Sequence, residues 1–248
     1  MKKLAGLHFI GAWLILLVAM VLFSGPAQAY VYDDFTSSGI DPSLWVDSGP
    51  NTGFFSQPGD GYLHFNDSSG GQADRLTSYN PVSGAFFVSM QYFDFQTINN
   101  QPANVGQSSA LRLRLESGTN NVGVEEGKNI NGLFFDGQAN RDGTRTPLKS
   151  VSAGTTNSGW LGMYYNGILG AGGVVDLWYD SGAGWTLLDS WAPNFSAAPY
   201  FSIYGLDQYG SSLSFQVNQV QVVPLPPSVL LLGSGLLGLA GWRRFRKV

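Results

Sequence analysis

The sequence predicts an all-β body, an antiparallel β-sandwich, between two terminal segments of different character. Apolar and polar side chains alternate along many short stretches, and no segment of residues 30–223 keeps a period of 3.6. Glycine-rich turns such as Pro58-Gly59-Asp60-Gly61 separate these stretches. The 248 residues are 14% aromatic and only 12% charged, against ~25% charged in an average globular protein. This composition disfavours a helical bundle.

Residues 1–29 have the pattern of a secretory signal peptide. A basic start is followed by an apolar stretch from Phe9 to Phe23, and Ala27-Gln28-Ala29 supplies the small residues that a peptidase needs. We expect a signal helix that signal peptidase removes before Tyr30. An uncleaved membrane anchor is the alternative interpretation.

Residues 30–223 form the predicted sandwich domain, with about twelve short strands. Leu111, Leu113 and Leu115 alternate with Arg112 and Arg114, so the leucines should point inward and the arginines outward. The stretch from Phe86 to Tyr92 is apolar on both faces, which predicts a central strand.

The last strand of the body changes parity along its length. Leu213, Phe215 and Val217 share one face, whereas Val220 and Val222 take the other. A one-residue bulge near Asn218-Gln219 would keep both sets on the core side.

Residues 224–248 form a tail in three parts. A proline-rich entrance comes first, then an apolar stretch from Val229 to Trp242, and finally a basic end. As a helix, the apolar stretch spans about 21 Å, against a hydrocarbon core of ~30 Å. With residues 225–228 it becomes a marginal transmembrane helix, whose basic end stays cytoplasmic and whose body lies outside.

The tail resembles the PEP-CTERM sorting domain of Gram-negative bacteria. The residues that carry the resemblance are the entrance, the apolar stretch and the basic end: Val223, Pro224, Leu225, Pro226, residues 230–239, Arg243, Arg244, Arg246 and Lys247. Leu225 stands where Glu is commonest in that family. The resemblance implies export across the inner membrane, transient anchoring, and processing by an exosortase, a membrane cysteine protease. It also implies residence at the cell surface or in an extracellular matrix, often with exopolysaccharide and biofilm.

Three other interpretations of the tail exist. A permanent membrane anchor is the main alternative. Leu225-Pro226-Pro227-Ser228-Val229 is similar to a Gram-positive sortase signal but lacks the Thr–Gly bond that is cut. A lipid-anchor signal should end in its hydrophobic part, and here the chain ends in basic residues.

Three parts of the body resemble concanavalin A-like lectin/glucanase domains. They are Tyr32-Asp33-Asp34-Phe35 with the turn that leads to Trp45, then Gly184-Trp185-Thr186-Leu187-Leu188, and the final long strand. The resemblance implies a jelly-roll sandwich of the kind that handles carbohydrate.

Charge and composition exclude several functions. The absence of cysteine excludes disulfides, iron–sulfur clusters and thiol catalysis. Residues 30–223 hold seven basic and seventeen acidic residues, a net charge of −10, which should repel nucleic acid. A neutral glycan, or an acidic one bridged by Ca²⁺, is the expected ligand.

Glycoside hydrolysis needs a pair of carboxylates at a set distance. The jelly-roll glucanase string Glu-x-Asp-x-Glu is absent, and the three glutamates are Glu116, Glu125 and Glu126. The last two are adjacent and point to opposite faces of a strand. We therefore expect a protein that is not an enzyme and has no catalytic residues.

Four tryptophans are candidates for stacking on sugar rings, with core packing as the alternative: Trp160, Trp178, Trp185 and Trp191. No cofactor is expected, although four acidic residues offer oxygen ligands for Ca²⁺, with a solvated acidic surface as the alternative: Asp33, Asp34, Asp60 and Asp207.

The sequence thus predicts a secreted, non-catalytic module associated with extracellular polysaccharide. A structural surface protein without glycan binding, and a glycan-active enzyme without a recognisable motif, remain the alternatives.

Overall fold

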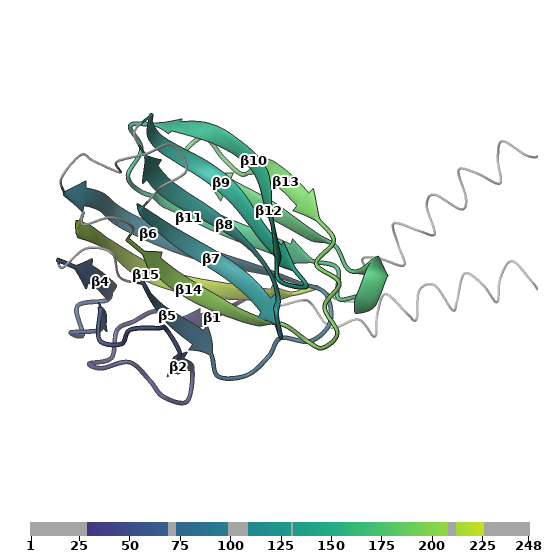
Figure 1. Ribbon diagram of the computed structural model, residues 1–248. Helices are drawn as coiled ribbons and strands as arrows, with labels where there is room; N and C mark the ends of the chain where they lie inside the picture. Colours follow the sequence, from purple (N-terminus) through teal and green to yellow (C-terminus); the bar gives the residue numbers. More distant parts are fainter. Residues whose placement is uncertain (1–28, 69–72, 99–108, 130, 208–211, 226–248) are drawn as a thin grey trace, which may run out of the picture. The chain divides into compact units, whose positions relative to one another are not determined.

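The computed structural model describes residues 29–68, 73–98, 109–129, 131–207 and 212–225 (Figure 1). These residues belong almost entirely to one compact unit, Ala29–Val223. The predicted signal helix and transmembrane helix fall on residues 1–28 and 226–248 and lie outside the described residues. Within the described ranges, no helix has both the length and the apolar character needed to cross a bilayer.

The body is an antiparallel sandwich of two sheets with almost no helix, as predicted (Figure 1). Sheet A has the order β13-β12-β11-β6-β15-β4-β3, and β1 also pairs with β15. Its strands are β1 (Tyr30–Asp33), β3 (Phe55–Ser56), β4 (Leu63–Asp67), β6 (Phe86–Ile98), β11 (Gly159–Tyr165), β12 (Val175–Asp180), β13 (Thr186–Trp191) and β15 (Ser212–Pro224).

Sheet B packs against sheet A and has the order β10-β9-β8-β7-β14-β5-β2. Its strands are β2 (Trp45–Asp47), β5 (Ala73–Ser78), β7 (Ser109–Ser117), β8 (Asn120–Asn129), β9 (Gly132–Arg141), β10 (Thr144–Gly154) and β14 (Tyr200–Leu206). A short 3₁₀ turn (Gly170–Gly172) is the helical element of the described body.

The core lies between the two sheets and confirms the predicted strand faces. Leu111, Leu113 and Leu115 are fully buried, whereas Arg112 and Arg114 lie on the outer face. Strand β6 lies inside sheet A, between β11 and β15, which confirms its central position.

Strand β15 confirms the predicted change of parity. Its buried residues are Leu213, Phe215 and Val217 and then Val220 and Val222, while the two residues between the sets are half-buried. Both sets of side chains therefore reach the core from one strand.

The first residues of the body are held by a buried carboxylate. Asp33 accepts a hydrogen bond from Trp45 Nε1 (2.7 Å) and another from the Phe35 backbone N–H (2.8 Å). The Phe35 backbone has φ 52°, a strained value for a bulky residue that these contacts hold in place. The segment that resembles the lectin/glucanase entrance therefore anchors β1 and β2 to the core.

Candidate functional site

The outer face of sheet B carries three rows of polar side chains that run across the strands. The first row is Tyr204, Arg112, Glu125, Asp136 and Ser150; the second is Ser202, Arg114, Gly123, Gln138 and Pro147; the third is Tyr200, Glu116, Asn121, Asn140 and Arg145. Residues opposite each other in such rows lie ~5 Å apart, so their side chains interact.

A hollow of about 230 Å³ opens above the middle row, where Gly123 has no side chain. We call it the arginine hollow and define it by the residues that line it: Arg112, Arg114, Asn121, Gly123, Gln138, Ala139, Asn140, Arg145, Tyr204 and Leu206. A Cβ atom at Gly123 would come within 2.9 Å of Arg112 Cδ and of the Leu113 carbonyl oxygen. Glycine thus allows the arginine to cross the strand and leaves the space beside it open.

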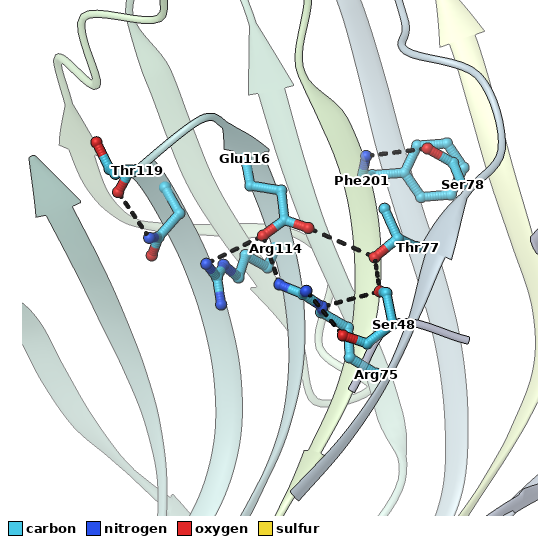
Figure 2. Close-up of polar contacts among 9 residues, drawn as sticks. Ser48, Arg75, Thr77, Ser78, Arg114, Glu116, Thr119 and Phe201 are labelled. Carbon is cyan, nitrogen blue, oxygen red and sulfur yellow. Dashed lines mark hydrogen bonds and ion pairs between the residues drawn. The ribbon is translucent and has the colours of Figure 1, made fainter. Parts of the chain in front are cut away.

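On one side of the arginine hollow, two arginines share one carboxylate (Figure 2). Glu116 Oε2 lies 2.9 Å from Arg75 Nη1 and 3.0 Å from Arg114 Nη2. Ser202, on the strand between β5 and β7, lies beneath this group and is fully buried. Its small side chain allows the pair to close above it.

On the other side, a chain of polar contacts runs through the buried carboxylate of Glu125. Arg112 forms an ion pair with Glu125 and donates its Nε–H at 2.6 Å. Gln138 Nε2 donates to the other oxygen of Glu125 at 2.9 Å, and Arg145 Nη2 donates to Gln138 Oε1 at 2.5 Å. The Arg112 side chain is 12% exposed and that of Glu125 is 0% exposed, so these charges are positioned by the fold.

Burial and charge affect the acid–base properties of this face. Burial, together with the charge of Glu125, raises the pKa of Asp136 to about 6. Burial also lowers the pKa of the Arg114 guanidinium, which nevertheless stays charged because its ordinary pKa is above 12. The face therefore keeps its cations at neutral pH.

Three polar atoms of these rows are buried without a hydrogen-bond partner among the described residues: Arg114 Nε, Asn140 Oδ1 and Ser202 Oγ. A buried polar atom without a partner costs ~1–3 kcal/mol. Arg114 and Asn140 line the arginine hollow, whereas Ser202 does not, so two of these atoms belong to residues of the hollow's wall.

The outer face of sheet A carries a second, more apolar hollow of about 450 Å³. We call it the tryptophan platform and define it by its lining: Phe87, Ser89, Trp160, Trp185, Gln219, Gln221 and Val223. The Trp185 ring lies edge-on to Phe87 with centroids 5.3 Å apart, and 6.3 Å from the Trp160 ring. Trp185 is 42% exposed, so part of its face is open to a ligand.

A glycine also lies at the centre of this platform. A Cβ atom at Gly162 would lie 2.6 Å from Phe87 Cζ and 2.8 Å from Trp185 Cζ3. The missing side chain allows the edges of both rings, which are perpendicular to each other, to approach β11 closely. Gly123 thus lines the arginine hollow, and Gly162 lies beneath two of the rings that line the tryptophan platform.

The structure brings two of the four candidate tryptophans together. Trp160 and Trp185 belong to the tryptophan platform. Trp178 lies on the same sheet, opposite Gly162, but is not part of the lining. Trp191 packs against the core, and the Arg141 guanidinium lies 5.1 Å from its ring centroid.

The four candidate calcium ligands accept hydrogen bonds from protein groups. Besides Asp33, Asp34 accepts from the Thr36 backbone N–H, Asp60 lies 2.8 Å from His64 Nε2, and Asp207 accepts from Ser109 Oγ. In the part of the chain that the structure describes, no group of three or more His, Asp or Glu residues could hold a metal ion.

The predicted processing and sorting residues lie at the two ends of the body. Ala29 and Tyr30 are exposed, and Tyr30 begins β1; Val223 and Pro224 end β15, and Leu225 follows. The remaining sites of this kind, Ala27, Pro226, Arg243, Arg244, Arg246 and Lys247, lie outside the described residues.

Comparison with known protein families identifies the tail. Residues 222–247 match the PEP-CTERM protein-sorting motif. The chain carries this sorting signal. The match includes every residue of the predicted signal, from Val223 to Lys247, and the last three residues of β15. No curated protein matches the sequence.

Solved structures share the fold of the body at low sequence identity. The GH43 protein BlXynB from Bacillus licheniformis is 12% identical over 78% of this chain and 39% of its own, with a TM-score of 0.61. A xylan β-1,4-xylosidase from Bacillus halodurans is 11% identical over 81% and 40%, with a TM-score of 0.59. The chain thus spans only about 40% of the length of these two proteins.

A lectin-like structure matches over most of both chains. The exoplasmic/lumenal domain of VIP36, solved with Ca²⁺ and Man3GlcNAc bound, is 10% identical over 81% of this chain and 90% of its own, with a TM-score of 0.54. These likenesses show a sandwich fold that is common to lectin-like and glycoside hydrolase proteins.

Two residues of the tryptophan platform were predicted from the sequence, whereas the arginine hollow was not. Arg112 and Arg114 were predicted to point outward, and nothing indicated that Arg75 from β5 and Arg145 from β10 would gather beside them. The overlooked signal is Gly123 in Asn121-Val122-Gly123-Val124-Glu125, a glycine within an alternating strand.

Proposed function

We propose that this is an exported protein, sorted to the cell surface through its PEP-CTERM motif, whose body binds polysaccharide without cleaving it. After removal of the signal peptide, the tail would anchor the chain in the inner membrane until an exosortase processes it. The body would then remain at the cell surface or in the extracellular matrix. The sorting motif supports the route, and the tryptophan platform is the observation that carries the binding function.

The tryptophan platform offers the two kinds of contact that a neutral sugar needs. The faces of Trp160 and Trp185 provide flat apolar area against the C–H side of a pyranose ring. Ser89, Gln219 and Gln221 provide neutral donors and acceptors for its hydroxyl groups. VIP36, which shares the fold, was solved with a mannose-containing glycan bound.

The non-catalytic part of the proposal is supported by the state of the three glutamates. Glu116 is held by two arginines, and Glu125 is fully buried against Arg112 and Gln138. Glu126 is fully buried between the sheets. A glycosidase needs an acid and a base that both reach the glycosidic bond, whereas two of these carboxylates are held by arginines and the third is enclosed in the core.

The test is calorimetric titration of the full chain, in detergent, with xylohexaose as the neutral probe. We expect Trp185→Ala to weaken binding about tenfold, equivalent to ~1.4 kcal/mol. Gly162→Ala should do the same, because the new methyl group displaces the Trp185 ring. Tyr79→Ala is the matched control, since Tyr79 is 56% exposed and lies outside the platform.

Three results would overturn the proposal. Release of reducing sugar above background would show that the protein is an enzyme. Equal affinity of wild type and Trp185→Ala, or no binding of xylohexaose, would remove the platform as the neutral-glycan site.

A further inference from the structure

The outer face of sheet B is locally basic although the body as a whole is acidic. Residues 30–223 contain seven basic residues against seventeen acidic ones. Four of the seven lie on this face: Arg75, Arg112, Arg114 and Arg145. They meet three carboxylates in the same rows, Glu116, Glu125 and Asp136, so the local net charge is +1 against −10 for the body.

One of these arginines is held beside the arginine hollow without a carboxylate partner among the described residues. Arg145 donates to an amide oxygen, Gln138 Oε1, which orients the guanidinium but leaves its charge unneutralised. The relay from Glu125 through Gln138 fixes the side chain over the hollow. A guanidinium positioned in this way binds a carboxylate through paired N–H donors.

The other residues that line the arginine hollow suit a ligand with hydroxyl groups better than a bare ion. Asn121, Gln138 and Asn140 line it with amide groups, and Asn140 Oδ1 is a buried acceptor without a partner in the described part of the chain. A sugar hydroxyl can supply the missing donor, whereas a halide, a sulfate or a carboxylate alone cannot, because none of these carries a hydrogen-bond donor.

We propose that the arginine hollow binds the carboxylate of a uronic acid residue in an anionic polysaccharide. Arg145 receives the carboxylate, and the amide groups of Asn121 and Asn140 receive the ring hydroxyls. The site lies on the sheet opposite the tryptophan platform and adds a second ligand class, so neither depends on the other. It also removes the need for Ca²⁺ to bridge an acidic body and an acidic glycan.

The test is titration of the full chain, in detergent and EDTA at physiological salt, with tetragalacturonic acid. We expect Arg145→Gln to weaken binding about tenfold, because one charge-assisted contact is lost. Asn140→Asp should weaken it as well, because it places a negative charge beside the ligand. Lys149→Gln is the matched control: it changes the net charge equally, and Lys149 lies outside the hollow, so its affinity should stay within about twofold of wild type. Thermal unfolding of each variant verifies the fold.

Several results would reject the proposal. Equal losses for Arg145→Gln and Lys149→Gln would mean general charge attraction. If a neutral galactose tetramer bound as tightly as tetragalacturonic acid, the carboxylate would not contribute to recognition. Displacement of the tetramer by millimolar inorganic phosphate would indicate a phosphate site, and dependence on Ca²⁺ or absence of binding would also overturn it. Trp185→Ala should leave tetragalacturonate binding unchanged, which separates this test from that of the tryptophan platform.

Discussion

Two adjacent glutamates on β8 lie on opposite faces of the sheet. A shift of one position along the strand therefore changes both the partners and the ionisation of the side chain. Glu125 faces the arginine rows and is paired. Glu126 points into the core, is fully buried, and neither of its oxygens has a hydrogen-bond partner among the described residues. Burial raises its pKa to about 8, and the nearby Tyr92 hydroxyl offsets part of that rise. Glu126 is therefore protonated in the folded protein at neutral pH.

This buried acid predicts that stability falls as pH rises. The folded-state pKa lies above the ordinary 4.5, so between those values the folded protein holds a proton that the unfolded chain has lost. The free energy of unfolding should fall by about 2 kcal/mol between pH 6 and pH 8. Denaturant titrations at the two pH values measure it; Asp136, whose pKa is raised by burial to about 6, also titrates at the lower end of this range.

Glu126→Gln is the matched variant, because the amide has the same shape and does not ionise. It should remove most of the fall between pH 6 and pH 8. A variant that retains the wild-type fall would assign the pH dependence to other groups.

At the scale of the element, both faces of β7 make contacts that matter for stability. Its leucines fill the core, and its arginines form ion pairs with carboxylates of the outer face. Leu113→Ala should cost ~2–5 kcal/mol of stability. Substitution of the outward Arg112 is not harmless either, since it leaves the Glu125 charge buried without its cation.

A double-mutant cycle measures how strongly Arg112 and Glu125 depend on each other. Arg112→Ala should destabilise the protein by roughly 3 kcal/mol at neutral pH, and Arg112→Ala with Glu125→Gln should recover a large part of the loss. The measurement is the free energy of unfolding of the four proteins in denaturant. Additive losses in the double variant would show that the two side chains do not act as a pair.

Strands with a long alternating pattern were predictable from sequence, and the shortest ones were not. The inward leucines of β7, the central place of β6 and the parity change in β15 follow from periodicity. Strands β2 and β3 have three and two residues, too few to show a period, so about twelve strands were expected where the described residues form fifteen.

The candidate sites were only partly predictable, for a related reason. Aromatic type indicated Trp160 and Trp185, but which tryptophans meet depends on the pairing of β11 with β6 and on the turn before β13. The arginine hollow depends on the order of five strands, which periodicity does not specify. Gly123 and Gly162 were the local signals of both hollows.

At the scale of the whole molecule, the two ends of the body lie side by side. Strand β1 pairs antiparallel with β15, and Tyr30 lies opposite Val222. The predicted N-terminal cleavage site and the start of the sorting motif therefore meet at one edge of sheet A.

This arrangement predicts that the tail is dispensable for the fold and that β15 is not. Deletion of residues 226–248 leaves β15 intact, so the unfolding temperature should stay within about 2 °C of wild type, and the protein should be released instead of retained at the membrane. Deletion of 212–248 removes the strand between β6 and β4 and should abolish cooperative unfolding. Calorimetry and fractionation measure the two effects; a failure of the shorter deletion to fold would show that the tail is structural.

The contact between the first and the last strand also determines when the body can finish folding during export. When the chain threads through a translocation channel from its N-terminus, β1 emerges at once but waits for its partner until nearly the whole body has followed. Until then sheet A lacks its interior strand β15. We therefore expect the body to stay incompletely folded, and so able to pass through the channel, until β15 has been translocated. The residues that finally close the sandwich, Val222 to Pro224, are also the first residues of the sorting motif. We therefore expect sheet A to be completed only when the sorting motif begins to emerge.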